Sequence, residues 1–148
     1  MAAQETSIII RTYNEEAHLP RLLEALGRQS YRDFEIVVVD SGSIDRTRDI
    51  VAPWADQLLR IDSHDFTFGY SLNVGIEAAV GRYATIVSAH TLPTDDGWLG
   101  ALVESLSDDA TAMSFGRQKA WSSSKFGEGQ DLGRTFGTKR LILRPPHF

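Results

Sequence analysis

Two short apolar runs near the N-terminus, each ending in a polar turn, constrain the fold of this chain most strongly. Residues 7–11 read Ser-Ile-Ile-Ile-Arg and continue into Thr-Tyr-Asn-Glu-Glu. Residues 35–39 read Glu-Ile-Val-Val-Val and continue into Asp-Ser-Gly-Ser-Ile-Asp. Continuous β-branched runs are typical of buried parallel strands, and open α/β sheets bind ligands beyond the carboxyl ends of such strands. The two runs therefore predict neighbouring parallel strands with a ligand site where they end.

The rest of the chain alternates short strand-like runs with helical periodicity, which predicts α/β units around a mostly parallel sheet. Leucines at 19, 22, 23 and 26 have the i, i+3, i+4, i+7 spacing of one apolar helix face. We predict further helices from about Ser43, which would be the N-cap, over residues 70–80 with Leu72, Ile76 and Ala79 buried, and over residues 96–106. Further strands are predicted at residues 58–61, 83–87 and 112–115, and the glycine- and serine-rich residues beyond 121 are predicted to form loops.

Composition excludes several classes of protein. A chain of 148 residues with 42% hydrophobic content can form one domain with a real core, and its net charge of −5 argues against a broad nucleic-acid-binding surface. The absence of cysteine excludes disulfides, a thiolate nucleophile and zinc–cysteine sites, and fits a reducing compartment. The apolar runs are too short to cross a bilayer, and the N-terminus does not resemble a signal peptide. We expect a cytoplasmic protein and leave open peripheral contact with a membrane.

The side chains of the two turns suit a nucleoside. Carboxylates can accept hydrogen bonds from a base N–H or from ribose hydroxyls, and an aromatic ring can stack on a base. Asp40 leaves a buried strand with no cation nearby in the sequence, which favours a ligand role over a structural one. Ser43 and Asp45 fit helix capping better, and Tyr13 fits either role.

Taken in order, residues 7–16, 34–47, 69–76 and 81–93 resemble the family 2 glycosyltransferases, whose N-terminal half is a Rossmann-like nucleotide-binding sheet of the GT-A type. The resemblance covers about residues 6–106 of a single domain, with residues 107–148 a partial continuation toward the acceptor side. It implies transfer of a sugar, with inversion, from a nucleotide-sugar donor such as a UDP-sugar to an acceptor hydroxyl. The residues that it places at the donor nucleotide are Thr12, Tyr13, Glu15, Asp40, Ser41, Asn73 and Ser88.

The sharpest departure from the family's pattern follows the predicted fourth strand. Relatives carry an Asp-any-Asp motif there, which holds a divalent metal on the donor diphosphate. Here the residues are Ser88-Ala89-His90. His90 could be a neutral ligand for manganese or magnesium, a protonated contact to the diphosphate itself, or part of a non-catalytic remnant. Leu72 also stands where many relatives have arginine, and Arg117 or Lys119 could replace that charge or be ordinary surface charges.

The resemblance also implies what this chain lacks. An inverting transfer needs a general base for the acceptor hydroxyl, and in the family that base lies downstream of residue 148 with the acceptor site. We therefore expect a truncated enzyme and nominate no catalytic residue. The alternative is a nucleotide-binding module without activity. The acceptor (a saccharide, a lipid-linked sugar or a protein) and the oligomeric state are not indicated by the sequence.

Overall fold

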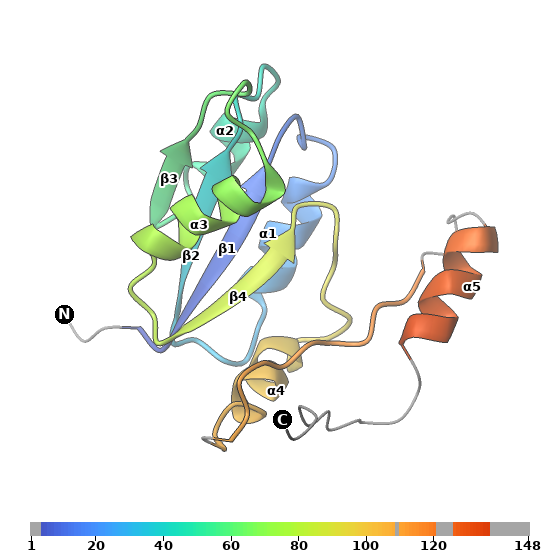
Figure 1. The fold of residues 1–148 in the computed structure, drawn as a ribbon. Coiled ribbons are helices and arrows are strands. Elements are labelled where there is room, and N and C mark those ends of the chain that lie inside the picture. Colours follow the sequence, from blue (N-terminus) through green and yellow to red (C-terminus); the bar gives the residue numbers. More distant parts are fainter. Residues whose placement is uncertain (1–3, 109, 121–125, 137–148) are drawn as a thin grey trace, which may run out of the picture. The chain divides into compact units, whose positions relative to one another are not determined.

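The computed structural model describes residues 4–108, 110–120 and 126–136, and the chain divides into two units, residues 1–112 and residues 113–148. The first unit contains a sheet of four parallel strands, β1 (Thr6–Thr12), β2 (Phe34–Asp40), β3 (Gln57–Arg60) and β4 (Tyr83–Ser88). Helices α1 (Leu19–Gly27), α2 (Thr47–Val51) and α3 (Phe68–Ala78) connect them, and α4 (Trp98–Glu104) follows β4 (Figure 1). The predicted α/β, Rossmann-like fold is confirmed.

The order of the strands, β3-β2-β1-β4, contains a reversal. The chain adds β2 and β3 on one side of β1 and then returns to place β4 on the other side. In open parallel sheets, ligands bind at such a switch point, outside the carboxyl ends of the strands. The topology therefore predicts that a ligand binds at the carboxyl ends of β1 and β4, near the two turns that follow β1 and β2.

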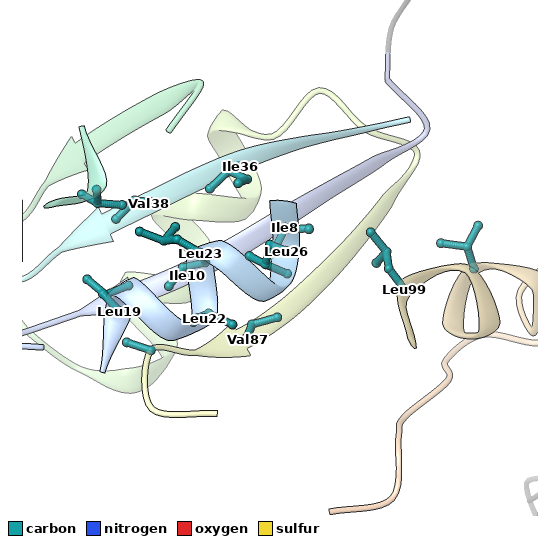
Figure 2. Close-up of a cluster of buried hydrophobic side chains, with 13 residues drawn as sticks. Ile8, Ile10, Leu19, Leu22, Leu23, Leu26, Ile36, Val38, Val87 and Leu99 are labelled. Atoms are coloured by element: carbon teal, nitrogen blue, oxygen red, sulfur yellow. The ribbon is translucent and has the colours of Figure 1, made fainter. Parts of the chain in front are cut away.

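One face of the sheet carries the main hydrophobic core, in which α1 packs on the strands (Figure 2). The predicted leucine face of α1 is buried, and Pro20 lies in the first helical turn, where its missing N–H costs nothing. Each such leucine contributes about 1.5–3 kcal/mol through burial. The cluster contains Ile8, Ile10, Leu19, Leu22, Leu23, Leu26, Ile36, Val38, Val51, Val87, Ala89, Leu99 and Val103.

The opposite face is covered by α3, which approaches β1 and β2 through small residues. Ser71 and Gly75 are its buried residues, and a Cβ at Gly75 would lie 2.6 Å from Ile9 Cγ2. The prediction that Ile76 is buried is wrong, because its side chain is 45% exposed. The helix is rotated so that glycine and serine, rather than the larger apolar residues, allow close packing on the strands.

Three other predictions need correction. The helix expected from Ser43 begins at Thr47, because Ser43 accepts a hydrogen bond from the backbone of Asn14 instead of capping a helix. Residues 112–115 form no strand, and residues 126–135, predicted as loop, contain α5 (Phe126–Thr135) of the second unit. In the part of the chain described here, no helix has the length and apolar character needed to cross a membrane.

Candidate functional site

The carboxyl ends of β1, β2 and β4 meet at one edge of the sheet. Thr12 pairs in register with Asp40 across β1 and β2, and Arg11 pairs with Ser88 across β1 and β4. Most of the residues predicted to contact a nucleotide therefore lie along this edge. Asn73 is the exception, because it is exposed on α3, outside the hydrogen bonds that organise the edge.

Backbone-to-side-chain hydrogen bonds join the two turns that follow β1 and β2. The amide of Asn14 donates to the Ser43 hydroxyl at 2.9 Å, and the amide of Ile44 donates to Asn14 Oδ1 at 2.9 Å. The amide of Glu15 donates to the Thr47 hydroxyl at 2.7 Å. Asn14 has a positive φ of 53°, which asparagine tolerates better than most residues and which aims its amide at the second turn.

A second set of bonds reinforces this junction further out. The amide of Glu16 donates to Asp45 Oδ2 at 3.2 Å, and the amide of Arg46 donates to Glu16 Oε2 at 3.0 Å. Desolvation alone would raise the pKa of Asp45, but hydrogen bonds from Thr47 and Glu16 lower it. These hydrogen bonds join the two turns into one unit, called the platform below. Sequence reasoning missed this, because the partners lie about 30 residues apart and polar turns carry no signal of which residues pair.

Asp40 lies at the centre of the platform and is fully buried. Its Oδ2 accepts from the amides of Gly42 at 3.2 Å and Ser43 at 3.0 Å, and its Oδ1 accepts from the Thr12 hydroxyl at 3.3 Å. A carboxylate offers about four lone-pair positions, so one remains for a ligand. Asp40 therefore has a structural role in shaping the turn, and its expected contact with a nucleotide stays a prediction.

The same edge carries polar groups without partners. Among the described residues, three buried side-chain polar atoms have no hydrogen bond: Thr6 Oγ1, Arg11 Nε and Ser41 Oγ. Two of them, on Arg11 and Ser41, lie at the ends of β1 and β2. Tyr13, two residues after Arg11 in the first turn, is 53% exposed. Buried polar groups are normally paired, so unpaired groups beside an exposed aromatic ring are typical of a ligand site.

Glu15 and His90, predicted from separate segments, are brought together. Glu15 Oε1 lies 3.4 Å from His90 Nδ1, and Glu15 Oε2 lies 3.0 Å from His18 Nδ1. Both imidazole side chains are mostly exposed, whereas the Glu15 side chain is 20% exposed. The carboxylate is thus held between two rings. His18 was not singled out from the sequence, where it lies three residues after Glu15 with nothing to mark the contact.

The residues after β4 do not form a metal site held by the protein alone. Ala89 is buried in the core, and Ser88 is half-buried, with its backbone oxygen accepting from Thr91. Magnesium prefers oxygen ligands and usually one or two carboxylates, and Glu15, the carboxylate that contacts His90, is already shared with His18. Among the described residues there is no group of three or more His, Cys, Asp or Glu side chains that could hold a metal.

Curated proteins similar in sequence to this chain are glycosyltransferases by name. The "PGL/p-HBAD biosynthesis glycosyltransferase" of Mycobacterium bovis (strain BCG / Pasteur 1173P2) is 37% identical over 94 residues, which cover 60% of this chain and 36% of that protein. The "Validoxylamine A glucosyltransferase" of Streptomyces hygroscopicus subsp. limoneus is 41% identical over 88 residues, covering 58% of this chain and 18% of that protein. The chain spans about a third or less of the length of these curated relatives.

Solved structures share the fold. The mannosyltransferase PcManGT from Pyrobaculum calidifontis, in complex with GDP-Man and Mn²⁺, superposes with a TM-score of 0.64 at 28% identity, covering 72% of this chain and 33% of that one. S. aureus TarS 1-349 in complex with UDP-GlcNAc superposes with a TM-score of 0.60 at 25% identity, covering 72% of this chain and 32% of that one. The sequence model of glycosyl transferase family 2 matches residues 7–147. The chain therefore belongs to glycosyl transferase family 2.

Proposed function

We propose that the edge formed by β1, β2 and β4 binds the nucleoside diphosphate part of a nucleotide-sugar donor. One combination of features carries the proposal. At the switch point of the sheet, the platform lies with two unpaired polar groups, on Arg11 and Ser41, and with the exposed ring of Tyr13. The neighbours solved with UDP-GlcNAc and GDP-Man support a donor of this class. Family membership favours a transferase over a binding module without activity.

The residues divide into two groups along the edge. Tyr13 would stack on the base, while Thr12, Glu15, Asp40 and Ser41 would accept or donate hydrogen bonds to the base and ribose. Ser88 and His90 would contact the diphosphate. Asn73 would have to reach the donor from α3, and no contact in the unliganded protein supports it directly.

The reaction proposed for the whole enzyme is an inverting sugar transfer. The acceptor hydroxyl oxygen forms a bond to the anomeric carbon, the bond from that carbon to the diphosphate breaks, and the acceptor proton passes to a general base. The nucleoside diphosphate leaves with the bonding electrons. Among the described residues we assign no general base, and the acceptor could be a saccharide, a lipid-linked sugar or a protein.

Ligand-dependent melting tests the proposal. UDP or GDP should raise the melting temperature of this chain, since a ligand at about 100 times its Kd stabilises a fold by about 2.7 kcal/mol. The measurement is repeated with Mn²⁺ and with a chelator. No shift with either nucleotide under either condition would contradict a donor site.

His90 can act in two ways, which one set of variants separates. If a protonated His90 contacts the diphosphate directly, His90→Lys keeps UDP affinity close to that of the wild type, while His90→Ala lowers it in the presence of chelator. If His90 instead holds Mn²⁺ on the diphosphate, both variants lose the Mn²⁺-dependent part of the affinity. Ser88 and His90 supply no carboxylate of their own, and Glu15, which contacts His90, is shared with His18. This arrangement favours the first outcome.

A further inference from the structure

Arg11 is the residue before the last in strand β1, on the face of the sheet that α3 covers. Ile9, two residues earlier, faces α3, because a Cβ at Gly75 would meet it. Alternate residues of a strand share a face, so Arg11 points to the same side as Ile9. Its register partners are Val39 on β2 and Ser88 on β4. Arg11 therefore lies at the switch point, level with a predicted donor residue.

An aromatic ring, not an acid, holds the guanidinium in place. Arg11 Cζ lies 4.7 Å from the ring centroid of Phe68, the first residue of α3. Phe68 in turn contacts Phe66 edge to face, with ring centroids 5.4 Å apart, and its own side chain is 68% exposed. Stacking on a ring fixes the plane of a guanidinium while leaving its N–H groups free to donate in that plane.

Within the described residues the guanidinium is also uncompensated. Its Nε is buried and donates to no acceptor, and Arg11 forms no ion pair there. Two acids of the neighbouring turns, Asp40 and Glu15, are already engaged, Asp40 by Thr12 and two backbone amides and Glu15 by two histidines. The other two, Glu16 and Asp45, accept hydrogen bonds from backbone amides of the opposite turn. A buried, unpaired donor on a cation is costly, and binding an anion there would remove that cost.

We propose that Arg11 binds the diphosphate of the donor, an inference that rests on the function proposed above. A phosphate is the anion whose geometry suits the fork of a guanidinium. Thr12 and Asp40 face the side of the sheet covered by α1, and Arg11 faces the other side. A nucleotide lying across the strand ends would therefore place its nucleoside on the platform and its phosphates toward Arg11 and β4.

This assignment also accounts for the charge that the family resemblance leaves missing. Leu72 stands where many relatives have arginine, and it is half-buried on α3, the same helix that supplies Phe68. Arg11 would supply a positive charge from β1 in its place. Arg117 and Lys119 belong to the second unit, and the proposal does not involve them.

The test compares the affinities of the whole chain for UDP and for uridine, measured with chelator at fixed ionic strength. Arg11→Gln should lower UDP affinity about tenfold to a hundredfold, the range for hydrogen bonds to charged groups, and leave uridine affinity within about twofold. Arg11→Lys should lie between Gln and wild type, because it keeps the charge but loses the fork. Arg48→Gln, on the exposed face of α2, removes the same charge and should change neither affinity.

The two proposals fail in different ways. If the wild type binds neither UDP, GDP nor uridine, the donor site is wrong and this inference is overturned with it. Two outcomes would overturn only the role of Arg11, provided that the wild type binds UDP. In one, Arg11→Gln lowers the affinities for UDP and uridine by the same factor; in the other, it lowers neither affinity. If Arg11→Gln does not fold, the wild type decides, because its Arg11 ¹⁵Nε resonance should shift on adding UDP but not uridine. An unshifted resonance at saturating UDP overturns the inference.

Discussion

Strand β2 carries a buried carboxylate near each end, Glu35 as its second residue and Asp40 as its last. The two carboxylates differ in how many polar groups around them lack a hydrogen-bond partner. Glu35, at the amino end, accepts from the Ser7 hydroxyl at 2.5 Å, the Val80 amide at 2.7 Å and the Gln57 side-chain amide at 3.1 Å. These partners come from β1, β3 and the segment between α3 and β4. The hydrogen bonds of Glu35 therefore join four parts of the fold, and no ligand is needed to explain its burial.

Asp40, at the carboxyl end, is equally buried but has incomplete surroundings. Within the part of the chain that the structure describes, the hydroxyl of Ser41, next to Asp40 in sequence, has no partner, and neither does Nε of Arg11 on the adjacent strand. Tyr13 is exposed beside them. A carboxylate alone does not distinguish a structural node from a binding site. Of the three unpaired buried atoms in the described residues, Thr6 Oγ1 lies at the amino end, in register with Phe34, whereas Arg11 Nε and Ser41 Oγ lie at the carboxyl end. The two unpaired donors together with the exposed Tyr13 make the carboxyl end the better candidate for a ligand site.

The largest expected effects come from removing the charge at either end of β2. Glu35→Gln and Asp40→Asn should each lower the free energy of unfolding by about 1.5–3 kcal/mol, because each leaves buried donors poorly paired. Only Asp40→Asn should also lower UDP affinity, by about tenfold or more. Urea unfolding and calorimetric titration measure the two quantities. Equal losses of UDP affinity in the two variants would remove the distinction between the two ends.

Tyr13 should affect binding without affecting stability. Tyr13→Ala should cost about 1–3 kcal/mol of nucleotide binding through lost stacking. Because the ring is 53% exposed, the free energy of unfolding should change by no more than about 0.5 kcal/mol. Tyr13→Phe keeps the ring and serves as the matched control. If Tyr13→Phe loses as much affinity as Tyr13→Ala, then the hydroxyl rather than the ring contacts the ligand.

The amino end of β2 should respond to acid. Burial alone would raise the pKa of Glu35, but the hydrogen bonds from Ser7, Val80 and Gln57 together lower it. A carboxyl whose folded pKa lies below its unfolded pKa stabilises the fold above the unfolded value, and that stability is lost as pH falls through the folded pKa. The stability difference between wild type and Glu35→Gln should therefore shrink between neutral pH and pH 3. A difference independent of pH would show that the charge of Glu35 contributes nothing.

Substitutions of two buried serines, Ser7 and Ser41, should have the smallest effects on stability and affinity. The two form a closely matched pair, because both side chains are buried and each substitution removes one hydroxyl. Ser7→Ala removes a hydroxyl that donates to Glu35, so it should destabilise the chain by about 1–2 kcal/mol. Ser41→Ala removes a buried hydroxyl with no partner, so stability should stay level or rise by up to about 1 kcal/mol. UDP affinity should fall a few fold in Ser41→Ala alone. A clear destabilisation by Ser41→Ala would mean that its hydroxyl is paired in the unliganded protein.

The sequence predicted the parts of this molecule that depend on local patterns. Apolar runs predicted β1 and β2, and leucine spacing predicted α1, because burial sets both periodicities. The start of α2 and the joined turns could not be predicted, since Asn14, Ser43 and Thr47 pair across about 30 residues. The buried face of α3 was not predicted, because it consists of serine and glycine, whose small size lets the helix approach the strands closely, and not of large apolar residues. No pattern in the sequence indicated a role for Arg11 either, because the lack of a partner for its Nε is a property of the folded structure.

Residue-resolved NMR of the whole chain during titration with UDP tests the central claim most directly. The account predicts that the amide resonances shifting most belong to residues 11–16, 40–47 and 88–91, at the carboxyl edge of the sheet. The amino end of the sheet, in the same unit, offers a competing pocket, lined by Glu5, Tyr31, Arg82, Tyr83, Gly100, Val103, Glu104 and Ser107. Shifts concentrated around that pocket, with the carboxyl edge unchanged, would contradict the account.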